Sequence, residues 1–227
     1  MSTHTTARPA VDLTARRRVG TAFLAAAGSW VAYIVLAFTV SAGYEEALVD
    51  ASEATDTAVN RLPAETLAEI TADHPWSNLS ALLLVFVPVL LIVATRRASA
   101  VTGERWSVRL AWLAAGVLWF YFLLNAGLFA GADSLPPLTR DLDVLTVPLV
   151  SAGSVLAIAA FVLAALGLRR HGWRRVAIAV AVFIVVADLV ISAVLLVTSG
   201  FEEPIAPIAL LPAELIVGIA LLVGGRR

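Results

Sequence analysis

Residues 176–201 read VAIAVAVFIVVADLVISAVLLVTSGF, an apolar stretch between Arg175 and Glu202 that carries one charged side chain, Asp188. About 20 consecutive apolar residues in a helix cross the hydrocarbon core of a bilayer, which is about 30 Å thick. This stretch is long enough for such a crossing, and it offers no polar face to water. It therefore predicts a transmembrane helix.

Five further stretches have the same character. We predict six transmembrane helices, at about residues 19–42, 77–95, 110–131, 145–168, 176–199 and 205–225. Of the 227 residues, 60% are hydrophobic and 15% are charged, which leaves too little polar surface for a water-soluble protein of this size. The sequence thus predicts an all-α, polytopic membrane helix bundle. It forms a single domain over 19–227, after a cytoplasmic tail at 1–18.

The arginines orient these helices. Every basic side chain is an arginine, and all sixteen except Arg61 and Arg140 lie in tails and loops that the alternating spans place on one side. Basic residues near the ends of spans stay in the cytoplasm during insertion. We therefore expect a multi-pass protein of the cell membrane with both termini cytoplasmic. The first span exceeds the roughly 7–15-residue apolar core of a cleavable signal peptide, so we expect it to be retained.

The segment 43–76 is the longest soluble stretch between spans, and it carries eight acidic side chains and one arginine. Apolar residues between Tyr44 and Leu62 recur at helical spacing and predict an amphipathic helix. Pro63 suits the first turn of a second helix at 64–72. We expect the two helices to form a short extracytoplasmic cap. Its acidic field can attract a cation or a partner outside the cell, although runs of charge more often form a solvated face.

Two acidic residues fall inside predicted spans at matching depth. Asp188 lies 13 residues after Arg175, and Glu214 lies 12 residues before Arg226. At 1.5 Å per residue, each is roughly 18–20 Å from the inner boundary, near the middle of the bilayer. The connection between the two spans is short, so we expect antiparallel neighbours whose carboxyl groups face each other, with at least one neutral at pH 7. Such a pair can share a proton or bind a cation or small molecule; alternatively, two protonated acids pin the helices together.

Three more residues inside the spans are candidates for polar contacts, Ser192 beside Asp188 and Tyr121 and Asn125 in the outer half of the membrane. Ser192 follows Asp188 by one helical turn, and Tyr121 and Asn125 are four residues apart on one face of the third span. Tyr121 and Asn125 either line a polar pocket or hydrogen-bond to a neighbouring helix.

Prolines and small residues inside the spans indicate how the helices pack. Pro88 frees the Leu84 carbonyl and predicts a kink, and Pro212 would free the Ile208 carbonyl as an acceptor. Small side chains allow close helix contact, and aromatic side chains in mid-span are typical of bundle interiors. We interpret the following residues as packing residues: Trp30, Tyr33, Ser151, Gly153, Ser154, Ala157, Ala160 and Ala164.

Several classes of function are unsupported. The chain has no cysteine, which excludes disulfides and thiol chemistry, and its three histidines, His4, His74 and His171, lack the spacing of metal ligands. It contains no recognised catalytic motif, so we predict no catalytic residues, no cofactor and no metal. The arginines are explained by topology and indicate no nucleic-acid binding. We expect the inner arginine clusters, such as 169–175 with Trp173, to contact anionic lipid headgroups of the bilayer.

The ending Ala206-Pro207-Ile208-Ala209-Leu210-Leu211-Pro212-Ala213-Glu214-Leu215, followed by Gly218, Leu221, Leu222 and Gly224-Gly225, resembles the last span of an uncharacterised six-span bacterial membrane family. The long polar segment after the first span is also similar. The chain has Ala220 where that family would have a tryptophan. The resemblance implies a six-span topology and a role for Glu214, without naming a reaction.

Three functions fit these observations. The first is a noncatalytic integral membrane protein whose bundle supports a partner or the cell envelope. The second is a binder, transporter or sensor of a small molecule or ion that uses Asp188 and Glu214. The third is an intramembrane enzyme that uses the same acids. Carboxyl groups that face a cavity favour the second function, whereas carboxyl groups packed without a cavity favour the first.

Overall fold

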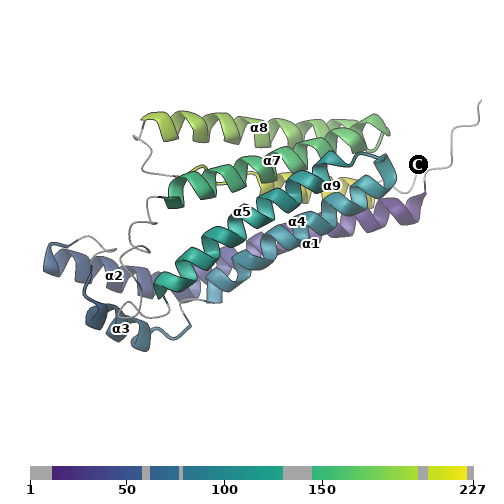
Figure 1. Cartoon of the computed structure of the whole chain (residues 1–227). Coiled ribbons are helices and arrows are strands. Elements are labelled where there is room, and N and C mark those ends of the chain that lie inside the picture. Colours follow the sequence, from purple (N-terminus) through teal and green to yellow (C-terminus); the bar gives the residue numbers. More distant parts are fainter. Residues whose placement is uncertain (1–11, 58–61, 77–78, 130–144, 199–203, 224–227) are drawn as a thin grey trace, which may run out of the picture.

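The computed structural model describes residues 12–57, 62–76, 79–129, 145–198 and 204–223, and within these ranges the regular structure is helical (Figure 1). The helices are α1 (Leu13–Leu36), the π-helical segment η1 (Ala37–Ser41), α2 (Ala42–Thr55), α3 (Ala64–Asp73), α4 (Leu79–Thr102), α5 (Trp106–Phe129), α7 (Thr146–Arg170), α8 (Arg175–Thr198) and α9 (Leu210–Val223).

Five helical stretches in the described ranges are long and apolar enough to cross a membrane. They are Leu13–Thr55, Val85–Thr102, Trp106–Leu123, Val147–Arg170 and Arg175–Thr198. The predicted all-α membrane bundle is therefore confirmed in its class. The predicted last span differs, because its helix, α9, begins only at Leu210 and has 14 residues.

The first span continues without a break into the acidic segment. α1, η1 and α2 form one helical run of 43 residues, so the predicted amphipathic helix is not a separate element. It ends at Thr55 rather than Leu62, because Asp56 adopts a left-handed conformation (φ 49°) and donates its N–H to the Glu53 and Ser52 carbonyls. The second predicted helix is present as α3, directly after Pro63. The Tyr44 and His74 rings contact edge to face at 6.1 Å and bring α3 back to the start of α2, beyond one end of the bundle (Figure 1).

Small residues bring the helices of the bundle together. α5 packs on α7 and α4, α1 packs on α4 and α9, and α8 lies against α7 and α9. Phe23 and Phe161 meet edge to face at the centre, with ring centroids 5.8 Å apart. The alanines predicted as a packing surface on α7 are buried. Gly153 is required as well, because a Cβ there would lie 2.6 Å from the Leu118 side chain.

The two ends of the chain's described part meet through α1 and α9, which run antiparallel. α1 begins at Leu13, inside the segment predicted as a tail, and Asp12 caps it by accepting the Thr14 and Ala15 N–H groups. The Arg16 side chain is buried and donates to the Ala220 carbonyl at 3.0 Å. A cation at a helix C-terminus is favourable, because unpaired carbonyls make that end negative.

Candidate functional site

The described chain before α9 is not helical: residues 204–207 have no regular structure, 208–209 form a turn, and Ile205 is buried in the bundle. A backbone N–H group buried in a membrane protein needs a partner, since no water is available in the hydrocarbon core. Pro204 and Pro207 have no N–H to satisfy. Ile205 donates its N–H to the Ser151 hydroxyl on α7 at 2.9 Å, in a buried contact. Ser151 is thus a hydrogen-bond acceptor for this segment as well as the small packing residue that the sequence indicated.

α9 starts with few unsatisfied donors. Leu210 donates to the Pro207 carbonyl at 3.1 Å, and Pro212 occupies the third helical position, where a missing N–H costs nothing. Pro212 has no N–H and cannot donate to the Ile208 carbonyl, which lies just before the helix rather than inside it. The role of this carbonyl as an acceptor stays a prediction.

Asp188 meets the beginning of α9. Its Oδ2 atom lies 3.5 Å from the Ala209 nitrogen, a long hydrogen bond compared with the usual 2.7–3.2 Å. The unpaired N–H groups give a helix N-terminus a partial positive charge, which a carboxylate stabilises. We interpret Asp188 as the residue on α8 that fixes where α9 begins.

A cavity of about 390 Å³ lies among α1, α4, α5, α7, α9 and the non-helical segment before α9. Most of its wall is apolar. Aromatic and polar side chains that line it come from four helices: Trp30, Tyr33, Tyr121, Phe122, Ser154 and Glu214. The volume lies within the range of roughly 300–1,000 Å³ that is typical of small-molecule sites.

Glu214 is the most unusual residue of this wall. It is the fifth residue of α9, it is 1% exposed, and its buried Oε2 atom has no hydrogen-bond partner in the described part of the chain. The Ser154 hydroxyl is also 1% exposed and unpaired there. A buried, unpaired polar group costs about 1–3 kcal/mol, and more when it is charged. Two such groups on the wall of one cavity indicate a place where a polar ligand atom would be stabilised.

The structure separates the predicted site residues. Glu214 and Tyr121 line the cavity, whereas Asp188 and the half-buried Ser192 are outside its lining. Within the described residues no hydrogen bond joins the two carboxyl groups, since Asp188 is engaged with Ala209. Asn125 belongs to α5, and its side chain lies outside the described residues.

Trp30, Tyr33 and Ser154 of the cavity wall are residues that the sequence assigned to helix packing. Trp30 and Tyr33 share a face of α1, and Ser154 follows Ser151 by one turn of α7, so each pair marks a helix face that is more polar than the rest of its span. We assigned these residues to packing because spacing alone does not show whether a face meets a helix or a cavity.

Pro88 lines the same cavity from α4. The Val85 carbonyl, three residues before Pro88, accepts the Trp119 indole N–H from α5 at 3.0 Å. The contact anchors α5 to α4 beside the cavity. The freed Leu84 carbonyl and the kink at Pro88 stay predictions.

Among the described residues, no group of three or more histidine, cysteine, aspartate or glutamate side chains is arranged to hold a metal ion. In comparisons with known proteins, no family model, no curated protein and no solved structure matches the chain. The function must therefore be argued from the cavity itself.

Proposed function

We propose that this chain is a six-crossing protein of the cell membrane, with both termini in the cytoplasm, that binds a small organic molecule in the cavity around Glu214. The Arg16–Ala220 contact supports an even number of crossings, because it brings the start of α1 and the end of α9 to one end of the bundle (Figure 1). α9 is about 21 Å long at 1.5 Å per residue. In this proposal the non-helical residues 204–209 before it supply the remaining length of the sixth crossing.

α2 and α3 lie together at the opposite end of the bundle (Figure 1). Their acidic side chains suit the outer face, to which the arginine distribution assigns only two of the sixteen basic residues, Arg61 and Arg140. In this proposal they form the extracytoplasmic cap, a surface available to a cation or to a partner outside the cell.

The observation that carries the binding proposal is the buried, unpaired Oε2 atom of Glu214 on the cavity wall. A carboxyl group that served only to hold two helices together would be hydrogen-bonded across their contact. An ionised acid in mid-membrane costs about 2.5–3.5 kcal/mol on insertion scales. A cationic ligand group beside Glu214 would recover part of that cost. This reasoning favours the small-molecule binder over the partner-supporting bundle.

The rest of the wall defines the ligand class. The rings of Trp30, Tyr33, Tyr121 and Phe122 provide apolar surface and electron-rich faces that attract cations. One acidic group among aromatic rings fits a small amphiphilic amine. Its ammonium group would pair with Glu214, and its apolar body would lie against the rings.

The test is a titration of the purified protein with a series of arylalkyl amines, each paired with the hydrocarbon in which a methyl group replaces the amino group. We expect saturable binding of amines at the best chain length and weaker binding of the matched hydrocarbons. Glu214→Gln should reduce amine affinity about 10- to 100-fold, the range for a hydrogen bond to a charged group. Asp188→Asn is the matched control and should retain the preference for amines.

Two results would contradict this scheme. Equal loss of affinity in Glu214→Gln and Asp188→Asn would show that both acids act as one site. No saturable binding of any amine in the series, by a wild-type protein that unfolds cooperatively, would refute the proposal and favour the partner-supporting bundle.

A further inference from the structure

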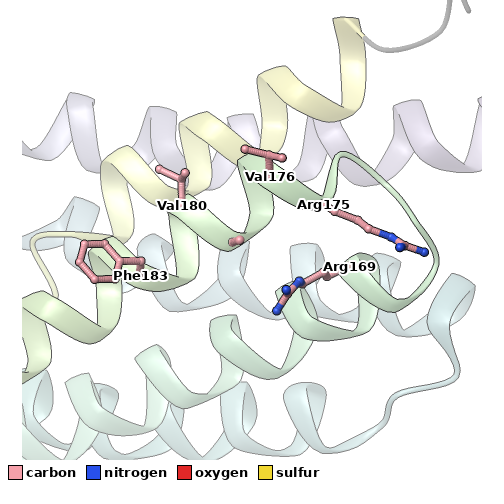
Figure 2. Close-up of a pocket in the computed structure, with 6 residues that line it drawn as sticks. Arg169, Arg175, Val176, Val180 and Phe183 are labelled. Atoms are coloured by element: carbon pink, nitrogen blue, oxygen red, sulfur yellow. The ribbon is translucent and has the colours of Figure 1, made fainter.

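A second depression lies on the outside of the molecule, at the end of the hairpin formed by α7 and α8. It has a volume of about 370 Å³ and is lined by Arg169, Arg175, Val176, Ala179, Val180 and Phe183 (Figure 2). We call it the hairpin groove. None of these residues lines the Glu214 cavity.

The turn between α7 and α8 fixes the backbone on either side of it, which carries Arg169 and Arg175. Gly172 has a φ of 77° and donates its N–H to the Arg169 carbonyl at 3.0 Å, while Trp173 donates to the Leu168 carbonyl at 3.3 Å. This pair of bonds is the Schellman arrangement, which satisfies the last carbonyls of a helix. Trp173 is buried under the turn. The backbone that carries Arg169 and Arg175 is therefore well fixed.

The apolar half of the groove runs along α8. Val176, Val180 and Phe183 are spaced by four and three residues, so they share one helix face, and they are 79%, 44% and 72% exposed. In Figure 2 they follow one another along α8, away from the end that carries Arg175. From Val176 to Phe183 the stripe extends for roughly 10 Å at 1.5 Å per residue.

The charged half of the groove is positive. Arg169 and Arg175 are exposed, and the segment 169–175 contains four arginines and no acidic residue. The groove also lies at the N-terminus of α8, where free N–H groups favour an anion. Anionic charge beside an apolar stripe is the chemistry of a phospholipid with an acidic headgroup. A free phosphate ion would use only the charged half.

We propose that the hairpin groove binds one anionic phospholipid of the cytoplasmic leaflet. The guanidinium groups of Arg169 and Arg175 hold its phosphate, and one acyl chain lies along Val176, Val180 and Phe183. The sequence indicated lipid contact at all inner arginine clusters alike; the groove assigns a specific site to one of them.

The position in the cytoplasmic leaflet rests on the proposed topology. The selectivity for anionic lipid in detergent is independent of that topology. The lipid site is also independent of the Glu214 ligand.

The test measures lipid retention by native mass spectrometry of the protein in neutral detergent, with dioleoyl phosphatidylglycerol or dioleoyl phosphatidylcholine added. We expect the wild-type protein to retain phosphatidylglycerol preferentially. Each arginine near a membrane surface strengthens anionic lipid binding about fivefold, so Arg169→Gln with Arg175→Gln should weaken it about thirtyfold. The control pair, Arg96→Gln with Arg97→Gln, removes the same charge from exposed positions of α4 and should leave retention near the wild-type level.

A second variant tests the apolar half. Phe183→Ala should reduce phosphatidylglycerol retention several-fold, since it removes exposed ring surface that the acyl chain would cover. Phe120→Ala, on the exposed face of α5, is its control and should have little effect. These surface changes should leave the melting temperature within a few degrees of wild type, which separates loss of lipid from loss of folding.

Three outcomes would overturn the proposal. Equal retention of the two lipids would show that the headgroup charge is not recognised. Equal losses in the two arginine pairs would show that general surface charge attracts the lipid. Displacement of phosphatidylglycerol by millimolar inorganic phosphate would show an anion site without a lipid component.

Discussion

The contact between α1 and α9 depends on two glycines that face each other, Gly20 and Gly218. A Cβ atom at Gly20 would lie 3.0 Å from the Gly218 carbonyl oxygen, 3.1 Å from the Leu221 Cβ and 3.2 Å from the Leu222 Cγ. One of these neighbours is backbone, so Gly20→Ala requires α9 to move by a few tenths of an ångström. Overpacking of this kind costs about 1–3 kcal/mol, and alanine recovers about 0.5–1 kcal/mol of helix propensity. We expect a net loss of about 0.5–2 kcal/mol in the free energy of unfolding.

The measurement is reversible unfolding of the purified protein in detergent, compared with Gly28→Ala. Gly28 belongs to the same helix, and no atom lies within 4 Å of its added Cβ, so this control should be neutral or slightly stabilising. Gly20→Ala should also weaken amine binding, because the displaced helix carries Glu214. If the two variants were equally stable, the close approach of α1 and α9 would be refuted.

Three further substitutions test single contacts by the same unfolding assay. Ser151→Ala should cost about 1–3 kcal/mol, because it leaves the buried Ile205 N–H unpaired. Ser154→Ala, one turn away, removes an unpaired hydroxyl and should be neutral or stabilising. The reverse order would contradict the hydrogen bond between Ile205 and Ser151. Trp119→Phe removes the indole hydrogen bond to the Val85 carbonyl of α4 and should cost about 0.5–1.5 kcal/mol. Trp112→Phe, at an exposed position of the same helix, should cost less, and equal losses would exclude that hydrogen bond. Asp188→Asn should cost about 0.3–1 kcal/mol, and an unchanged stability would argue against its role at the start of α9.

The sequence predicts the helices well because the length of an apolar stretch is a direct physical requirement of the bilayer. It predicts less well where a helix ends inside such a stretch. Pro204, Pro207 and Pro212 lie within nine residues, and the described chain has no regular structure at 204–207 and a turn at 208–209 before α9 begins. Hydropathy does not register this change, because helical and non-helical segments of the same residues are equally apolar.

The relation between the two acids also depends on contacts that the sequence does not show. Depth follows from counting residues along a helix, and Asp188 and Glu214 were placed at equal depth on that basis. The face that Glu214 presents depends on the rotation of α9 about its own axis, which counting residues does not give. The rotation follows instead from Gly218 against Gly20 and from Asp188 at Ala209. These are contacts between distant segments, which periodicity does not reveal.

The first acidic helix differs from the expectation in another way, because a predicted end of a membrane span is not an end of the helix. Gly43 and the change from apolar to acidic composition predicted an end to the first span there. No proline interrupts the chain between Tyr33 and Leu62, so the backbone hydrogen bonds continue through η1 into α2. The change from apolar to acidic side chains is therefore not accompanied by an end of the helix.

The central claim is that Glu214 gives the internal cavity an affinity for cations. The chain has no cysteine, so Ser154→Cys places a single, nearly isosteric thiol on the cavity wall. The most direct measurement compares the rates at which a cationic and an anionic methanethiosulfonate of similar size label this thiol in the purified protein, each divided by the rate of the same reagent with a free small thiol. We predict that the cationic reagent reacts roughly tenfold faster or more, and that adding Glu214→Gln removes the difference. Equal rates for the two reagents, or a charge preference that persists in Glu214→Gln, would contradict the account.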